Sequence, residues 1–153
     1  TLRQNANLQP VWYNHVKYRG LQQLGFWLWR RHWCSPSLPF SGNSAAFVAL
    51  TRGAPEVYLL GISNSYAKYL HVDENNVTWA LGAYGPKASE QASGYKHKSL
   101  VPHGVSVTFH HSRVANDNFG ELSRYACHYN QRLYNATPDS LIDTIERRPL
   151  PLE

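Results

Sequence analysis

The sequence predicts a single α+β domain over residues 1–153, with mostly antiparallel strands and a few short helices. Composition is the first observation, because 42% of the residues are apolar and only 16% are charged, as is typical of a packed globular protein. The second is a series of short Val- and Tyr-rich runs separated by Gly, Pro, Asn and Asp, the pattern of strands joined by turns. The third is a pair of helix-start signals near the C-terminal end.

In the first part of the chain we expect one short helix, one strand and one loop. Apolar positions between Pro10 and Gly25 predict the helix. It would end at Gly25, because glycine readily adopts the left-handed conformation that closes many helices. The aromatic run Phe26–Trp29 predicts a strand. The prolines, serines and glycine of Cys34–Gly42 are typical of a loop.

The middle of the chain predicts four strands. Ala46–Leu50 and Glu56–Ile62 are apolar and are expected to be buried strands. A turn over Arg52–Pro55 would join them. Tyr69–Val72 and Val77–Leu81 flank a tetrapeptide of Asp, Glu and Asn residues, which predicts a β-hairpin.

The last part of the chain predicts a long loop over Gly82–Ser99, a strand over Val101–His111 and two helices. The first helix is expected to begin at Asn118, because Glu121 three residues later completes a capping box. The second is expected to begin at Thr137–Pro138, an N-cap residue followed by the residue favoured at the first helical position. The apolar face of the first helix repeats every three or four residues: Phe119, Leu122, Tyr125, Ala126, Tyr129 and Leu133.

The first third of the chain is basic and rich in tryptophan. The formal net charge is +5, yet the first acidic residue is Glu56, and four of the five tryptophans precede it. Such a segment either packs its indoles and extends its arginines into solvent, or forms a binding patch. A patch of this kind would bind a host or target protein, the phosphates of a nucleic acid, or an anionic membrane surface. Its candidate residues are Arg19, Trp27, Trp29, Arg30, Arg31 and Trp33.

Two cysteines and two glycosylation sequons predict a secreted protein. Cys34 and Cys127 are expected to form a disulfide that closes a loop of about 93 residues, worth about 4 kcal/mol in the chain-entropy model. The alternative is two unrelated buried thiols in an intracellular protein. The sequons make Asn76 and Asn135 candidate glycosylation sites. We expect the chain to be a mature form or an excised domain, with the final two residues, 152–153, as a vector remnant.

Three short stretches occur in an order that resembles a known toxin family. Gln22–Trp29 resembles a helix-to-strand step, Ser41–Leu50 a Ser-rich strand, and Arg113–Phe119 an Asp/Asn-rich turn. Cys34 matches a loop cysteine, and Thr137–Ile142 matches a closing helix. This order is similar to that of the catalytic subunit of pertussis-type ADP-ribosyltransferase toxins. The resemblance implies that family's fold, with split antiparallel sheets, and a cofactor site for NAD.

The residues that perform this family's chemistry are not found at the matching positions. The family uses an arginine for the cofactor phosphates, a Ser-Thr-Ser strand, and a glutamate that stabilises an oxocarbenium-like transition state. These positions fall near Trp12–Tyr13, on Ala49–Thr51 and near Tyr129–Arg132, and the last range holds no carboxylate. We therefore expect a catalytically inactive relative that uses no cofactor and acts as a secreted effector through binding. A diverged active transferase using NAD is the alternative.

Histidine chemistry offers a further alternative. The chain has eight histidines, and a pair of imidazoles could act as acid and base in RNA cleavage. On a strand, however, the neighbours His110 and His111 would point to opposite faces. Neither the histidines nor the cysteines have the spacing of a metal site, so no metal is expected. The histidines of the C-terminal half are His97, His103, His110, His111 and His128.

Overall fold

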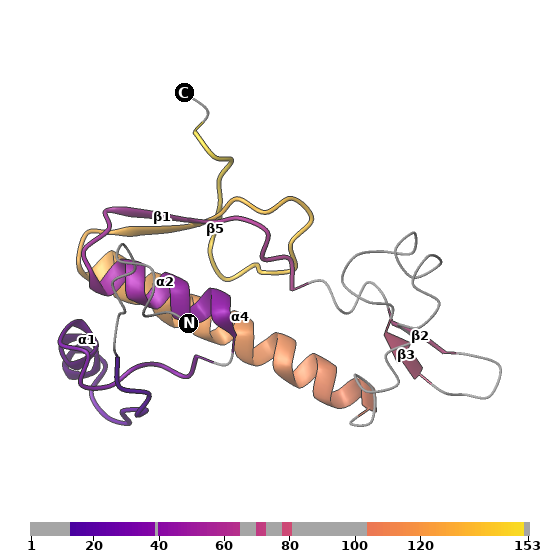
Figure 1. Ribbon diagram of the computed structural model, residues 1–153, viewed down its shortest axis with the longest axis horizontal. Helices are drawn as coiled ribbons and strands as arrows, with labels where there is room; N and C mark the ends of the chain where they lie inside the picture. Colours follow the sequence, from indigo (N-terminus) through magenta and orange to yellow (C-terminus); the bar gives the residue numbers. More distant parts are fainter. Residues whose placement is uncertain (1–12, 39, 65–69, 73–77, 81–103, 152–153) are drawn as a thin grey trace, which may run out of the picture.

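The residues that the structure describes form three helices, a three-stranded sheet and a hairpin. The structure is a computed structural model that describes residues 13–38, 40–64, 70–72, 78–80 and 104–151 (Figure 1). None of the helices described combines the length and the hydrophobicity that a bilayer span requires. In chain order the elements are α1 (Gln22–Arg30), α2 (Ser41–Thr51), β1 (Glu56–Leu59), β2 (Leu70–Val72), β3 (Thr78–Ala80), α4 (Gly104–His128), β4 (Arg132–Asn135) and β5 (Glu146–Arg147).

The three-stranded sheet is parallel throughout, with β4 between β1 and β5. The pairing of β1 with β4 runs from Glu56 opposite Arg132 to Leu59 opposite Asn135. The predicted fold of mostly antiparallel, split sheets is therefore wrong. Within the described residues, only β2 and β3 pair in the antiparallel sense, as the hairpin prediction required. The tip of that hairpin, residues 73–77, lies outside the described residues.

Two helices each lead directly into a strand, and this repetition makes the strands parallel. α2 turns into β1 through Arg52–Pro55, as the sequence predicted, and α4 turns into β4 through residues 129–131. α2 and α4 lie side by side beneath the sheet (Figure 1). The core lies between these two helices, α1 and the sheet. Its central buried members are Phe26, Trp29, Phe47, Leu50, Leu59, Phe119, Leu122, Tyr125, Leu133 and Ile142.

The helices α1, α2 and α4 end in the same way, with one residue in the left-handed conformation. That residue is His32 after α1, Gly53 after α2 and Asn130 after α4, with φ angles of 58°, 90° and 56°. In each case its N–H donates to the carbonyl three residues back, and the next N–H donates to the carbonyl five residues back. This Schellman motif satisfies carbonyls that would otherwise lack partners. Asparagine and histidine can replace glycine here because they tolerate positive φ better than most residues.

The predicted helix ending at Gly25 and the predicted strand over Phe26–Trp29 are wrong, because these residues belong to the single helix α1. Gly25 lies inside the helix, where an added Cβ would stand 3.1 Å from Cδ1 of Tyr18. The glycine therefore allows the Tyr18 ring to pack closely and does not end the helix. Gly25, Phe26 and Trp29 are the buried residues of α1, at the spacing of one helical face.

Two other predicted strands are also helical. Ala46–Leu50 belongs to α2, and Val101–His111 enters α4 from residue 104 onward. A short apolar run does not by itself distinguish a buried strand from a buried helix. Because α4 begins well before it, Asn118 is a buried residue inside this helix, and its predicted role as an N-cap is wrong. The predicted apolar face does lie in the core: Phe119, Leu122, Tyr125 and Ala126.

Asn135 and Thr137 connect β4 to the segments on either side of it. Asn135 is 2% exposed; its Nδ2 donates to the carbonyl of Ile142 at 3.0 Å, and its Oδ1 accepts the N–H of Thr137 at 3.0 Å. The Thr137 hydroxyl donates to the carbonyl of Leu59 and accepts the N–H of Ile62, both at 3.1 Å. The Thr137 hydroxyl is therefore used in these two hydrogen bonds and does not cap a helix. Residues 136–145 form an irregular connection to β5. The predicted helix beginning at Thr137–Pro138 is therefore wrong.

Replacing Asn135 with alanine is expected to lower the free energy of unfolding by about 3 kcal/mol. The change leaves the N–H of Thr137 and the carbonyl of Ile142 buried without their partner. Denaturant unfolding of the two proteins measures the difference. Asn14→Ala, at an exposed position, is the matched control and should change stability by less than about 0.5 kcal/mol. Equal stabilities for the two variants would show that the buried network does not hold this region.

Candidate functional site

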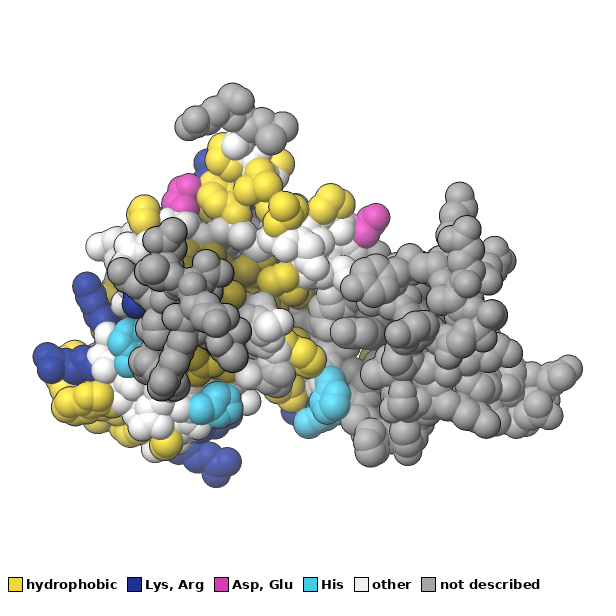
Figure 2. All heavy atoms as spheres, viewed as in Figure 1, with side chains coloured by type: hydrophobic (Ala, Val, Ile, Leu, Met, Phe, Trp, Pro, Cys, Tyr) yellow, Lys and Arg dark blue, Asp and Glu magenta, His cyan; other side chains and the backbone are white. Residues whose placement is uncertain are grey.

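One end of α1 presents arginine and tryptophan side chains to solvent. We call Trp27, Arg30, Arg31 and Trp33 the α1 patch. The rings of Trp27 and Trp33 meet edge to face, with their centroids 5.5 Å apart. The guanidinium carbon of Arg31 lies 4.3 Å from the centre of the Trp27 ring and 5.9 Å from that of Trp33. Figure 2 shows dark blue arginine and lysine side chains beside yellow hydrophobic ones at this end of the molecule, at the lower left.

The end of α1 determines where Trp33 lies. The left-handed residue His32 turns the chain, and the N–H of Trp33 donates back to the carbonyl of Leu28 at 3.1 Å. This return brings the Trp33 ring against Trp27, although both rings stay open to solvent, with exposed fractions of 59% and 40%. Exposed large rings held in fixed positions are typical of binding surfaces.

Arg30 extends the patch to the C-terminal end of α4. Its guanidinium carbon lies 4.6 Å from the ring centre of Tyr129, which in turn lies 4.9 Å from the ring of Tyr125. Burial, and then the neighbouring Tyr129, raise the pKa of Tyr125 to about 12, so this phenol is neutral at physiological pH. Among the described residues, neither Arg30 nor Arg31 forms an ion pair. Both cations are therefore available to an external anion.

The other two residues of the predicted patch lie elsewhere. Trp29 is 7% exposed and packs against Phe26, Phe47 and Tyr125. It is turned away from Trp27 because two residues along a helix differ in direction by about 200°. Arg19 is exposed in the segment before α1.

The sequence prediction missed two exposed leucines beside the patch. Leu21, the residue just before α1, and Leu24, in its first turn, are 78% and 45% exposed. Their spacing of three residues, continued by Trp27, is the signal that would have identified them once the segment was recognised as a helix.

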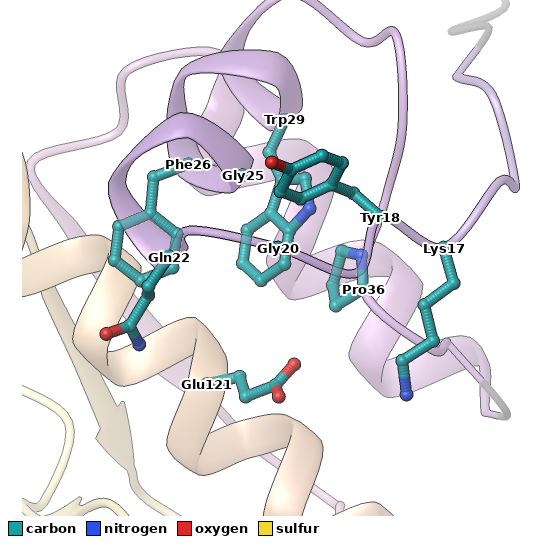
Figure 3. A pocket seen from close by; sticks show the side chains of 9 residues that line it. All are labelled: Lys17, Tyr18, Gly20, Gln22, Gly25, Phe26, Trp29, Pro36 and Glu121. Atoms are coloured by element: carbon teal, nitrogen blue, oxygen red, sulfur yellow. The ribbon is translucent and has the colours of Figure 1, made fainter.

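The inner side of α1 borders a pocket of about 220 Å³ (Figure 3). It lies between α1, the segment before α1 and the middle of α4. Glu121, which the sequence prediction assigned to a capping box, belongs to this pocket. The Nε1–H of Trp29 is buried and has no hydrogen-bond partner within the described part of the chain. The lining residues are Lys17, Tyr18, Gly20, Gln22, Gly25, Phe26, Trp29, Pro36 and Glu121.

The structure does not contain the predicted disulfide, because Cys34 and Cys127 are both free. Cys34 is buried in the core, and this burial raises the pKa of its thiol. Cys127 is exposed on α4, with its Sγ 3.6 Å from a guanidinium nitrogen of Arg132. A disulfide needs two Cβ atoms about 3.8 Å apart, and here the buried Cys34 and the exposed Cys127 are not joined.

Of the two candidate glycosylation sites, Asn76 lies outside the described residues and Asn135 is buried. A glycan would be attached through Nδ2 of Asn135, the atom that donates to Ile142. Glycosylation at Asn135 is therefore incompatible with this fold.

The predicted histidine pair is only partly described. His97 and His103 lie outside the described residues, whereas His110 and His111 are exposed neighbours on α4, with ring centroids 6.1 Å apart. His128 packs beside Phe26 at 5.6 Å. In residues 13–38, 40–64, 70–72, 78–80 and 104–151, no group of three or more His, Cys, Asp or Glu residues could hold a metal ion.

The segments that resemble the ADP-ribosyltransferase family do not form the expected strands, because Phe26–Trp29 and Ser41–Leu50 are helical. Of the three positions that the resemblance assigns to catalysis, the first includes residue 12, which lies outside the described residues. Ala49–Thr51 lies at the end of α2, and residues 129–132 comprise the turn after α4 and the first residue of β4. No family model, curated protein or solved structure matches the chain.

In the folded protein, one thiol is expected to react with a small alkylating reagent. Cys127 is exposed and should be labelled, whereas Cys34 is buried with a raised pKa and should react only after unfolding. Mass spectrometry counts one label before denaturation and two labels after it. Cys127→Ser should remove the first label. No label under either condition, with a mass two hydrogens lower, would instead show the disulfide.

Proposed function

We propose that the protein acts by binding, and that the α1 patch recognises an acidic protein partner. The observation that carries this proposal is the Arg31 guanidinium placed against two exposed indoles, 4.3 Å from the centre of one ring and 5.9 Å from the other. Arginine and tryptophan are the residues most enriched among those that dominate binding energies at protein interfaces.

The arrangement favours a carboxylate as the group that Arg31 would bind. A guanidinium stacked on a ring keeps its N–H edge free, and this edge matches a carboxylate through two parallel hydrogen bonds. The flanking rings of Trp27 and Trp33 would exclude water from such a pair, which strengthens it. No acidic residue precedes Glu56 in the chain, so the segment that carries the patch supplies no competing carboxylate.

The same features fit a nucleic acid or a membrane less well. Arg31 lies over the Trp27 ring, where a base would have to stack. In a membrane interface, apolar side chains insert together while the cations stay at the edge with the headgroups. Here the cation packs directly against the Trp27 ring, to one side of the pair of indoles. Leu21 and Leu24 then add an apolar border to a site for a protein.

The proposal keeps the predicted effector role but not the predicted fold. Secretion stays a prediction, as do the alternatives of a diverged transferase and a histidine-dependent ribonuclease. Binding through α1 requires neither NAD nor a metal.

Selection from a displayed library of random peptides tests the proposal. Peptides retained by the immobilised protein should be enriched in Asp or Glu next to aromatic or aliphatic residues. For a synthetic copy of a selected peptide, Arg31→Ala is expected to weaken binding about 30-fold, the equivalent of about 2 kcal/mol. Arg31→Lys should recover only part of this loss, because an ammonium group cannot form the paired hydrogen bonds.

Arg52→Ala is the matched control, since Arg52 is an exposed arginine after α2 and outside the patch. It should leave affinity unchanged, and all variants should keep the parent melting temperature. Selected peptides without acidic residues, or equal affinities for the Arg31 and Arg52 variants, would contradict the proposal. A further outcome is that the protein fails to bind peptides but binds phosphatidylserine vesicles or a single-stranded oligonucleotide in a way that requires Arg31. That result would contradict the proposal and show that the partner is a membrane or a nucleic acid.

A further inference from the structure

The inner side of α1 carries a second feature that the α1 patch does not use. The pocket behind Phe26 and Trp29 has a volume of about 220 Å³. At about 30 Å³ per water molecule, this space corresponds to roughly seven waters, which suits a molecule of about seven to ten non-hydrogen atoms. Three aromatic residues line it together with polar side chains, a combination found in many small-molecule sites: Tyr18, Phe26 and Trp29.

Two opposite charges belong to this pocket. Lys17 comes from the segment before α1 and Glu121 from α4. Figure 3 shows both side chains reaching to the same side of the pocket, below the aromatic rings. They do not form an ion pair with each other, and neither has another ion-pair partner in the described part of the chain. A ligand with one anionic and one cationic group could pair with both.

A third polar group also lacks a partner. Trp29 is 7% exposed, and its Nε1–H is buried without a hydrogen bond among the described residues. Buried N–H groups without a partner are rare, because each has lost its hydrogen bond with water and gained no other, which costs free energy. The indole of Trp29 lines the pocket together with Tyr18 and Pro36 (Figure 3). Since this nitrogen is itself buried, other atoms of the Trp29 indole form its part of the pocket wall.

The position of Tyr18 preserves the space. A Cβ at Gly20 would clash with the Tyr18 hydroxyl oxygen, and one at Gly25 would stand 3.1 Å from Cδ1 of the same ring. The two glycines therefore allow the Tyr18 ring to lie against the backbone as one wall of the pocket. A bulkier residue at either position would push the ring away from this wall.

We propose that this pocket binds a small zwitterion, a free α-amino acid with an apolar side chain. Its ammonium group pairs with Glu121, its carboxylate pairs with Lys17, and its side chain packs against Phe26, Tyr18 and the Trp29 ring. L-Leucine, with nine non-hydrogen atoms, is the probe of matching size. This site is separate from the α1 patch, because the two use opposite sides of α1.

Calorimetric titration with L-leucine tests the proposal, and a Kd below about 1 mM is expected for a ligand of this size. Two analogues each lack one charge: 4-methylpentanoate has no ammonium group, and 3-methylbutylamine has no carboxylate. Each should bind at least about 10-fold more weakly than leucine, which corresponds to the loss of one charge-assisted contact. D-Leucine should also bind more weakly, because its two charged groups cannot reach both partners with the side chain in place.

Two variants assign the charges. Glu121→Gln should reduce leucine affinity to that of 4-methylpentanoate without changing the affinity for 4-methylpentanoate itself. Lys17→Gln should reduce leucine affinity to that of 3-methylbutylamine and leave the affinity for 3-methylbutylamine itself unchanged. In nitrogen–proton NMR spectra, the indole resonance of Trp29, assigned with Trp29→Phe, should shift when leucine fills the pocket, because this ring forms part of the pocket wall.

The result that would overturn the proposal is no heat and no indole shift at leucine concentrations up to about 10 mM, well above the expected Kd. Equal binding of leucine and both analogues would also overturn it, since it would show an apolar pocket without charge recognition. Arg31→Ala should bind leucine as the parent protein does. The two proposals can therefore fail separately. A failed peptide-binding test would not change the leucine titration, and a failed leucine titration would not change peptide binding.

Discussion

Two buried amide side chains at the ends of β4 hold the rest of the structure in place. Gln131, just before the strand, donates from Nε2 to the carbonyls of Leu50 at 2.9 Å and Ala54 at 2.7 Å, and so attaches the end of α2 and the turn into β1. Asn135, at the end of the strand, attaches the connection to β5. A parallel sheet of such short strands has few ladder hydrogen bonds. The side chains that bracket its central strand therefore contribute much of its order.

This arrangement leaves α1 outside the sheet, attached through one face only. Phe26 and Trp29 pack against Tyr125 of α4, and Trp29 also packs against Phe47 of α2. The remaining surface of α1 carries Trp27 and Arg31 to solvent. The Schellman turn at His32 then brings Trp33 back to this surface. A helix fixed by its inner face and open on its outer face can supply one side to a pocket and the other to a partner.

The sequence was sufficient for features that depend on local chemistry. The turn Arg52–Pro55, β1, the β2–β3 hairpin and the apolar face that begins at Phe119 were all predicted. Helix endings were not, because the prediction relied on glycine, whereas His32 and Asn130 occupy left-handed positions and Gly25 serves packing. For the site, composition identified Trp27, Arg31 and Trp33. Composition could not show that Trp29 is buried while Trp27 is exposed, because the predicted strand would place both residues on the same face.

The two-faced helix α1 is the central claim, and fluorine NMR of protein labelled with 5-fluorotryptophan tests it most directly. Single Trp→Phe replacements assign the signals, and a soluble paramagnetic agent measures the exposure of each ring. The structure predicts strong broadening for Trp27 and Trp33 and little for Trp29, with Arg31→Ala shifting the first two signals only. Equal broadening of Trp27 and Trp29 would show that these residues share one face, as on a strand, and would contradict both the patch and the pocket.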